Sequence, residues 1–375
     1  MRKLYLTLLL PGIVFQSIII AGGYGTGQEL SVFFLSLGAR EGLLGILLIP
    51  IPVISLSAIL SFELARKFRA YDYRTFLQLL MGRGWFVWEI GFLIGLTIFF
   101  GVMGSAAGEI FSRTFGLPYA GGTVFLMLAI AFLVFWGSVI VERVLSAWSG
   151  VLYLTYIIFF VWAFNRFGDN IFSSLAMPPT GGNWLRNGTA YAGLQLSMMP
   201  AVLFALRHIK TRTQAIGAGL LVGPIAMIPG ILFYLVMLTH YPEIREVVLP
   251  SDYLLEAIGA RWFQVLFQVV LLGTLIETGV GVIHSFNERL ASLYRARNQE
   301  MPRKLRPVMA LILMVIASLL TKIGLVALIM FAAKSFAWFF LLVFLVPLLT
   351  VGIRRISRNG ATMPLEQEAR VKMAD

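Results

Sequence analysis

Long apolar stretches separated by short polar loops run through almost the whole chain. About 20 apolar residues suffice for a helix to cross the ~30 Å hydrocarbon core of a bilayer. Ten stretches meet this requirement closely enough to be predicted as membrane-spanning helices: residues 4–38, 42–65, 85–112, 119–141, 144–165, 188–207, 213–240, 262–288, 306–321 and 323–352. Many are longer than a perpendicular helix needs, so the pattern predicts tilted or interrupted helices.

The composition agrees with an all-α polytopic membrane protein. The chain has 375 residues, of which 59% are hydrophobic and 13% charged, and its mean hydropathy is +0.86. A soluble domain has about 45–50% apolar and about 25% charged residues. Cysteine is absent, which excludes disulfides and thiolate chemistry. Arg2 and Lys3 precede the first apolar stretch, but no cleavage site of small residues follows, so we expect no cleaved signal.

The basic residues predict the orientation. With the N-terminus inside, 22 of the 30 lysines and arginines fall on the cytoplasmic side and seven on the outer side, as the positive-inside rule requires. We therefore expect a multi-pass protein of the cell (inner) membrane with both termini in the cytoplasm. The basic loops would face anionic lipid, which accounts for the net charge of +12 without nucleic acid.

A cluster of glycines interrupts the first stretch, in "AGGYGTGQEL" at residues 21–30. Each glycine disfavours helix by about 1 kcal/mol relative to alanine, and the four are Gly22, Gly23, Gly25 and Gly27. Unwound backbone persists at membrane depth only where it lines a cavity or is buried in protein. The spacing of Gly23 and Gly27 also fits close helix packing, but packing does not require the accompanying Thr26, Gln28 and Glu29. The pattern predicts a broken helix that binds a ligand.

The sixth stretch carries a second interruption, in "GTAYAGLQLSMMPAVLFALRHIK". Pro200 removes a backbone donor in mid-span, and Gln195 and Ser197 are polar at the same depth. Two interrupted helices at corresponding positions of two halves indicate a transporter binding site. The predicted substrate-binding residues are Gly22, Gly23, Tyr24, Gly25, Thr26, Gly27, Gln28, Gln195, Ser197 and Met198.

Ten spans divide into two five-helix repeats of inverted topology. The predicted organisation is a first repeat at residues 1–167, an outer loop at 168–187, a second repeat at 188–353 and a cytoplasmic tail at 354–375. Within the second repeat, residues 241–261 predict a short surface helix capped by Ser251.

The eighth stretch places polar side chains on one helical face. Thr274, Glu277 and Thr278 follow i, i+3, i+4 spacing in "GTLIETGVGV". A carboxylate near the bilayer centre is costly and is by default functional. Two interpretations stay open: the hydroxyl groups complete a Na⁺ site and Glu277 couples cations, or the face is a polar seam in which Glu277 pairs with a basic residue.

Three further charged residues form a predicted charge network with this carboxylate: Glu29, Glu109 and Lys334. Lys334 lies in "FAAKSFAWFF", near mid-membrane. It either pairs with Glu277 or Glu29, or serves as a site for a substrate carboxylate or as a cation that replaces Na⁺. Glu109 is nearer the outer surface, where it would be a gate or a snorkelling charge. Glu29 would neutralise the positive end of the outer half-helix, so the substrate would be a zwitterion or a cation unless Glu29 pairs with Lys334.

The glycine motif resembles the "GAGFASGQEI" signature of the YkvI-like bacterial membrane proteins. The matching part is Gly23, an aromatic residue at Tyr24, and Gly27, Gln28 and Glu29, whereas Gly25 and Thr26 stand where that family favours alanine and serine. The resemblance implies membership of the amino acid–polyamine–organocation superfamily, with its LeuT-type 5+5 inverted-repeat fold. It also implies that spans one and six hold the substrate, and that a Na⁺ site would use backbone carbonyls near Ser17 and Ile20 with the hydroxyl groups of Thr274 and Thr278.

Together these features predict a symporter for a small polar metabolite, an amino acid or related compound, coupled to Na⁺ or H⁺. An uncoupled exchanger and an ion channel are the alternatives. An integral membrane enzyme is disfavoured because no His-rich or Asp-rich metal cluster and no hydrolase motif occur in the sequence. No cofactor beyond the coupling ion is expected. The sequence leaves the substrate, the coupling ion and the oligomeric state open.

Overall fold

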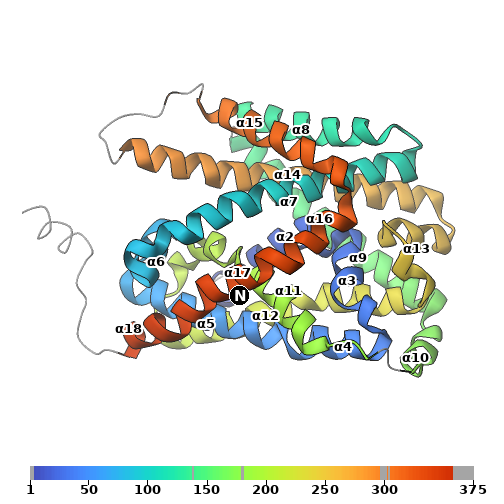
Figure 1. Cartoon of the computed structure of the whole chain (residues 1–375), viewed down its shortest axis with the longest axis horizontal. Helices are drawn as coiled ribbons and strands as arrows, with labels where there is room; N and C mark the ends of the chain where they lie inside the picture. Colours follow the sequence, from blue (N-terminus) through green and yellow to red (C-terminus); the bar gives the residue numbers. More distant parts are fainter. Residues whose placement is uncertain (1–3, 137–138, 179–180, 296–301, 303–304, 358–375) are drawn as a thin grey trace, which may run out of the picture.

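The computed structural model describes residues 4–136, 139–178, 181–295, 302 and 305–357, and these residues form helices and connecting loops without any β-strand. The predicted cytoplasmic tail lies outside the described residues from 358 onward, as does most of the loop at 296–304. The all-α architecture predicted from the hydropathy pattern is confirmed (Figure 1).

The first five predicted spans occupy residues 5–167. Their α-helices are α2 (Leu10–Gly22), α3 (Gln28–Phe33), α4 (Ala39–Leu48), α5 (Pro50–Phe68), α6 (Tyr73–Met81), α7 (Trp85–Phe115), α8 (Tyr119–Trp136) and α9 (Val139–Phe167). Short 3₁₀ or π segments join or extend them: η1 (Tyr5–Leu9), η2 (Tyr24–Thr26), η3 (Leu35–Leu37) and η4 (Gly82–Gly84). Helix α9 begins five residues earlier than the predicted span at 144–165.

The second half follows after α10 (Asn170–Leu175). Its α-helices are α11 (Trp184–Leu196), α12 (Arg212–Leu238), α13 (Pro250–Ile258), α14 (Arg261–Arg295), α15 (Leu305–Leu320), α16 (Leu325–Phe331), α17 (Ala337–Phe340) and α18 (Ile353–Ser357). The 3₁₀ and π segments are η5 (Met199–His208), η6 (Glu243–Glu246), η7 (Thr321–Ile323), η8 (Ala332–Phe336), η9 (Leu341–Leu345) and η10 (Leu348–Gly352).

The helix lengths are compatible with ten spans. Among the described residues, six helical segments are long and apolar enough to cross a membrane, and a seventh span forms if α11 and η5 are taken together across their bend of 59°. Shorter apolar helices account for the rest: one pair on either side of the glycine cluster, one at Tyr119–Val134 and one at Leu311–Ile323.

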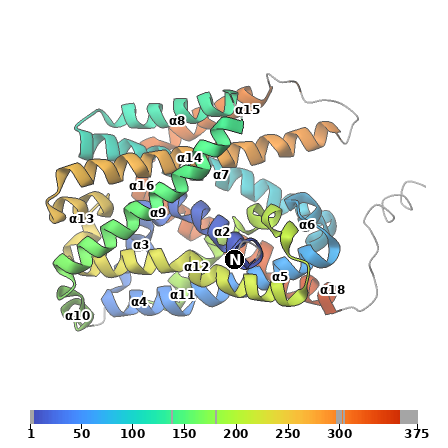
Figure 2. The ribbon, with the colours of Figure 1, turned by 180° about the vertical axis from the view of Figure 1, so that it is seen from behind.

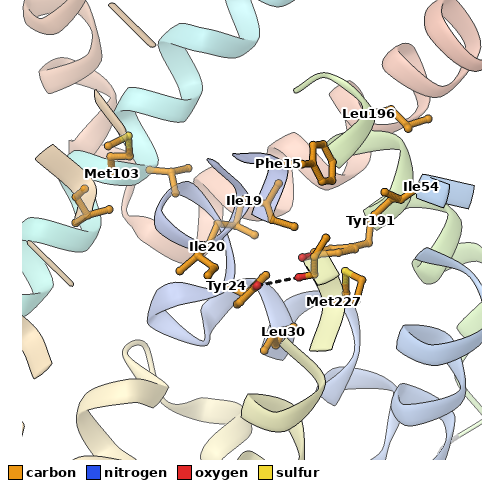
Figure 3. Packing of buried hydrophobic residues seen from close by; sticks show 14 of the residues in the cluster. Phe15, Ile19, Ile20, Tyr24, Leu30, Ile54, Met103, Tyr191, Leu196 and Met227 are labelled. Carbon is orange, nitrogen blue, oxygen red and sulfur yellow. Dashed lines mark hydrogen bonds between the residues drawn. The ribbon is translucent and has the colours of Figure 1, made fainter. Parts of the chain in front are cut away.

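Helix α12 packs closely against α5 and α2. A Cβ atom added to Gly223 would lie 2.3 Å from the carbonyl oxygen of Ile51, and one added to Gly219 would lie 2.5 Å from the amide nitrogen of Ile59. The two glycines therefore let the backbones of α12 and α5 approach more closely than any side chain would allow. The core beside this contact contains Phe15, Tyr24 and other fully buried side chains (Figure 3).

The connecting elements separate into two ends of the bundle. Helices α10 and α13 lie at one end, and α6 and α18 lie at the other (Figures 1 and 2). The sequence assigns the first pair to the outer side and the second pair to the cytoplasmic side, so the two sets of loops are separated in space as the charge pattern requires.

The short helix at 241–261 exists as α13, but its predicted cap is wrong. Leu249 occupies the N-cap and makes no side-chain cap, and Pro250 opens the helix. Proline is favoured at this first position because its missing N–H group needs no partner there. Ser251 is completely buried and lies one position further in. The helix also buries Leu254, Leu255 and Ile258 against the bundle, so it is not simply a surface helix.

Candidate functional site

The break in span one is a single 3₁₀ turn between two α-helices. Helix α2 ends at Gly22, Gly23 has φ −120° and ψ −105°, and Gly27 has φ +82° before α3 begins at Gln28. The value at Gly27 lies in the left-handed region, which glycine occupies without the steric cost that other residues incur. The glycine cluster thus unwinds the helix, as the sequence predicts.

Space also requires glycine on both sides of the break. A Cβ atom at Gly23 would lie 2.5 Å from the carbonyl oxygen of Ile19 and 2.6 Å from Oε2 of Glu29. A Cβ atom at Gly27 would lie 2.7 Å from the ring of Phe233 and 2.8 Å from Cβ of Pro250. Gly23 therefore allows the carboxylate of Glu29 to approach the unwound backbone, and Gly27 allows α13 and α12 to close over it.

Side chains within and around the break hold it in place. The hydroxyl of Tyr24 donates to the carbonyl of Ala226 at 2.9 Å (Figure 3). The hydroxyl of Tyr156 donates to the carbonyl of Gly25 at 3.2 Å. Thr26 accepts the backbone N–H of Gln28 through its Oγ1 at 3.3 Å. These contacts give Tyr24 and Thr26 a role in shaping the break.

Gln28 connects the break to the segment that precedes α13. With its amide oriented to satisfy both carbonyls, its nitrogen donates to Val247 at 3.0 Å and to Val248 at 3.1 Å. Its side chain is buried. The outer half of span one is therefore tied to the loop between α12 and α14.

Span six breaks between α11 and η5. The hydroxyl of Ser197 donates to the carbonyl of Leu194 at 2.7 Å, and Met199 begins a 3₁₀ segment that contains Pro200. The two helical parts meet at an angle of 59°. The second predicted interruption is confirmed, and it lies beside the first because η5 contacts α2.

A cavity opens between these two breaks. Its empty volume, which includes space open to the surroundings, is about 690 Å³. Spans one, three, six and ten contribute its walls. The lining residues are Ile18, Ile19, Gly23, Glu29, Phe92, Gly95, Leu96, Ile98, Phe99, Val102, Leu194, Gln195, Ser197, Met198, Ile329, Ala332, Phe336 and Phe340.

Glu29 is the charged residue of this lining. Its side chain is 5% exposed, and Nε2 of Gln195 donates to its Oε2 at 3.3 Å. The contact joins the outer half of span one to the inner end of α11. A carboxylate is thus held at the meeting point of the two breaks.

The structure brings together part of the predicted substrate site. Gly23, Gln195, Ser197 and Met198 line the cavity together with Glu29, which the sequence assigns to the charge network. The remaining predicted residues form the break but are not part of the lining: Gly22, Tyr24, Gly25, Thr26, Gly27 and Gln28.

The aromatic wall of the cavity was missed by sequence reasoning. Phe92 and Phe99 come from α7, and Phe336 and Phe340 come from η8 and α17. The signal present in the sequence is the spacing of Phe92, Gly95 and Phe99, which places them on one face of a helix. That face is indistinguishable from ordinary membrane-helix packing until spans three and ten are placed beside span one.

The residues of the predicted Na⁺ site lie on two helices in contact, α2 and α14. The hydroxyl of Ser17 donates to the carbonyl of Val14 at 2.9 Å, and that of Thr274 donates to Val270 at 2.8 Å. Each hydroxyl oxygen keeps lone pairs for a cation. Thr278 and Ile20 are also buried. Hydroxyl and backbone carbonyl oxygens are the type of donor that a small hard cation binds, and a Na⁺ site formed by the carbonyls near Ser17 and Ile20 with the hydroxyl groups of Thr274 and Thr278 stays a prediction.

The predicted charged residues occupy separate environments. Glu277 is half-buried on α14, close enough to Tyr153 for an electrostatic interaction, and is not part of the cavity lining. Lys334 is exposed in η8 and forms no ion pair with any carboxylate of the described residues. The structure therefore does not form the pairing of Lys334 with Glu29, which was one of the alternatives left open by the sequence. Glu109 pairs with Arg113 on the same helix at 2.7 Å.

A buried polar network at the end of the bundle that contains α10 and α13 has no counterpart in the sequence prediction. Oδ1 of Asp252 on α13 accepts the hydroxyl of Thr114 at 2.7 Å and Nε2 of Gln264 at 2.9 Å. Arg261 donates to Gln264 at 2.8 Å and also to the carbonyl of Thr114. The network fixes α13 against α7 and α14. It unites residues more than 130 positions apart, which no local pattern reveals.

Comparison with solved structures identifies proteins of similar fold. No protein-family model matches the chain, and no curated protein matches it in sequence. Among solved structures it is similar to the manganese transporter of Eremococcus coleocola, crystallised with an aromatic bis-isothiourea substituted compound. The TM-score is 0.61 at 16% identity, over 92% of this chain and 78% of that one.

A second solved structure is MhsT in complex with L-phenylalanine. Its TM-score is 0.59 at 16% identity, over 92% of this chain and 87% of the MhsT chain. At such low identity the likeness shows the fold alone. It confirms the predicted LeuT-type architecture with interrupted first and sixth spans.

Proposed function

We propose that this protein is a secondary-active transporter that moves a small polar metabolite across the membrane by alternating access. The observation that carries the proposal is the cavity between two broken helices, with a buried carboxylate and an amide at its polar end. Broken helices at corresponding positions are how transporters of this architecture expose polar backbone to a substrate at mid-membrane. The substrate is an amino acid or a related compound.

The similar solved structures support the proposed transport function, and their names mention two kinds of ligand, a metal ion and an amino acid. One is named a manganese transporter and the other was crystallised with L-phenylalanine. In this chain the cavity walls are mostly aliphatic and aromatic, and the described residues contain no group of three or more His, Cys, Asp or Glu side chains suited to a metal ion. This chemistry favours an organic substrate. The glycine motif supports the proposal that the chain is one of the YkvI-like proteins of the amino acid–polyamine–organocation superfamily.

Transport is proposed to be coupled to Na⁺ or H⁺. For Na⁺, Ser17 and the carbonyl of Ile20 on α2 would join Thr274 and Thr278 on α14 in holding the ion, whose charge would link the two helices. For H⁺, Glu277 is the proposed coupling carboxylate. The proposed location is the cell (inner) membrane with both termini cytoplasmic, and the distribution of basic residues supports this orientation.

An ion channel or an uncoupled exchanger is the alternative. A cavity bounded by two helix breaks favours an occluded site over an open pore.

The proposal is tested with the purified protein in proteoliposomes. We expect counterflow of a labelled substrate that depends on unlabelled substrate on the opposite side, together with accumulation under a Na⁺ or pH gradient. Counterflow without gradient-driven accumulation would indicate an uncoupled exchanger. Large passive ion currents without counterflow would indicate a channel and would refute the proposal.

A further inference from the structure

The polar end of the cavity is rich in hydrogen-bond acceptors. Ser197 uses its hydroxyl hydrogen on the carbonyl of Leu194 at 2.7 Å, so its oxygen presents lone pairs. Gln195 directs its amide nitrogen to Glu29 at 3.3 Å, which leaves its carbonyl oxygen as an acceptor. Glu29 itself has two carboxylate oxygens, with about four lone-pair positions between them.

The carboxylate of Glu29 has less compensation than its burial demands. It is 5% exposed and its hydrogen bond comes from the neutral amide of Gln195. Lys334, one of the basic residues that could have neutralised it, is exposed and forms no ion pair with the carboxylates in the described part of the chain. Buried charges in proteins are normally paired with an opposite charge or a metal. A buried carboxyl group without such a partner takes up a proton, so an ammonium group on the ligand would supply the cation that keeps Glu29 ionised.

The rest of the cavity fits an apolar body. Phe92 and Phe99 on α7 face the same space as Phe336 and Phe340 in span ten, with aliphatic side chains between them. Aromatic rings also attract a cation placed over their faces. A ligand with a cationic head and a compact hydrocarbon or aromatic tail satisfies both ends of this site.

The carboxylate also opposes a second negative charge at the break. Oε2 of Glu29 lies so close to Gly23 that it would be 2.6 Å from a Cβ atom there. A substrate carboxylate that approached the unwound backbone at Gly23 would meet this anion. Like charges held close together in a low-dielectric site repel strongly. The arrangement thus disfavours a zwitterion relative to an amine that lacks a carboxylate.

We infer that the cavity takes an amine with an apolar body, whose ammonium group binds Glu29, Gln195 and Ser197 and whose tail lies against the phenylalanines. This inference rests on the proposed transport function for its biological meaning. The binding chemistry itself is tested separately from transport.

Three probes share a phenyl ring and differ in charge. 2-Phenylethylamine carries an ammonium group, L-phenylalanine carries an ammonium and a carboxylate, and 3-phenylpropionate carries only a carboxylate. Their binding to the purified full-length chain is measured by titration calorimetry. We expect the amine to bind at least about 10-fold more tightly than either carboxylate-bearing probe, because only the amine pairs with Glu29 without repulsion at Gly23.

Glu29→Gln keeps the shape of the side chain and removes its charge. We expect it to weaken amine binding about 100-fold or more, which is the scale for removing one partner of a buried charge pair. Glu256→Gln is the matched control, because Glu256 is exposed on α13 and does not line the cavity; its affinity should equal that of the wild type. If Glu29→Gln does not fold, Glu29→Asp retains the charge at a shorter reach, and about 10-fold weaker amine binding is expected.

Four results would overturn the inference: no binding of the amine, equal or tighter binding of L-phenylalanine, amine affinity unchanged in both Glu29 variants, or saturable Mn²⁺ binding that competes with the amine and requires Glu29. Counterflow with the same probes separates this inference from the proposed function. Counterflow of L-phenylalanine but not of the amine would refute the amine inference while supporting the proposed transport function. Amine binding without counterflow of any probe would support the amine site while refuting the proposed transport function.

Discussion

At the residue scale, two glycines in the first break serve different needs. Gly23 provides space for the carbonyl of Ile19 and the carboxylate of Glu29. Gly27 provides both space and a left-handed backbone, with φ +82°. Gly116 has a similar conformation, φ +66°, but no atom lies within 4 Å of the position where its Cβ would be. Comparing substitutions at Gly27 and Gly116 therefore separates the effect of backbone strain, present at both positions, from the effect of steric crowding, present only at Gly27.

Replacing Gly27 with alanine should destabilise the protein more than replacing Gly116. Gly116→Ala incurs only the left-handed strain of about 1–2 kcal/mol. Gly27→Ala adds overpacking against Phe233 and Pro250, typically about 1–3 kcal/mol. Thermal melting in detergent measures the difference, and Gly27→Leu should in addition abolish transport while the protein still inserts. Equal melting temperatures for the two alanine variants would show that the packing around Gly27 yields easily.

Glu277 is the residue that tests coupling. Glu277→Gln keeps hydrogen bonding and removes titration, so a proton-driven transporter should lose accumulation under a pH gradient but keep counterflow, which needs no net proton movement. If Na⁺ is coupled instead, Thr278→Ala should weaken Na⁺-dependent binding and Glu277→Gln should change mainly stability. Accumulation is measured in proteoliposomes under each gradient separately. Undiminished accumulation of the Glu277 variant under both would exclude this carboxylate from the mechanism.

At the element scale, short segments outside the spans close the end of the bundle that contains α10 and α13. Helix α13 is fixed by Asp252 to α7 and α14, and Gln28 ties the preceding loop to the first break. The turn after α12 contains His240, whose ring packs edge-on to Phe167 and Tyr253 at 4.8 Å and 5.5 Å between centroids. These contacts connect α9, α12 and α13 at one end of the molecule.

The stability of this turn should depend on pH through His240. Burial lowers the pKa of His240, and nearby Glu243 opposes this effect without reversing it. The unfolded chain, with an ordinary histidine pKa of about 6.5, then binds more protons than the folded one. The contribution to stability is complete above that pKa and is lost as the pH falls below it toward the lowered folded value.

We therefore expect the melting temperature of the wild type to fall more between pH 7.5 and pH 5.5 than that of His240→Gln. The glutamine variant supplies the control for every other titrating group in the chain. Parallel pH profiles for the two proteins would show that His240 does not contribute.

At the scale of the whole molecule, the fold places two sets of loops at opposite ends (Figures 1 and 2). The predicted cytoplasmic end contains α6 and α18, and the predicted outer end contains α10 and α13. This division assigns a side of the membrane to every loop once one of them is located. The absence of native cysteine makes that measurement direct.

Single cysteines at two exposed serines test the orientation. Ser173 in α10 and Ser357 in α18 are both exposed. In intact cells, Ser173→Cys should react with a membrane-impermeant maleimide added from outside, and Ser357→Cys should react only after the membrane is opened. Labelling in the opposite pattern would invert the assignment of both termini.

The sequence by itself determined the class of the protein and the two places where its helices break. Lipid-exposed spans must satisfy their own backbone, so long apolar stretches specify helices. The helix breaks were predictable because glycine and proline disrupt a helix at their own positions. The first break contains four glycines within residues 22–27, and the second contains Pro200 among polar residues. The LeuT-type arrangement followed from the resemblance of the motif around Gly23 and Gln28.

Only the tertiary structure decided which side chains meet at the site. Which side chain meets Glu29 depends on the relative rotation of spans one, six and ten, and the sequence left open whether Lys334 pairs with Glu29 or with Glu277. The four cavity phenylalanines and the Asp252 network likewise come from elements distant in the chain. Their positions are set by close packing between helices, as at Gly223 against Ile51, and the hydrophobic pattern of a membrane helix, apolar on every face, contains little information about which face meets which neighbour.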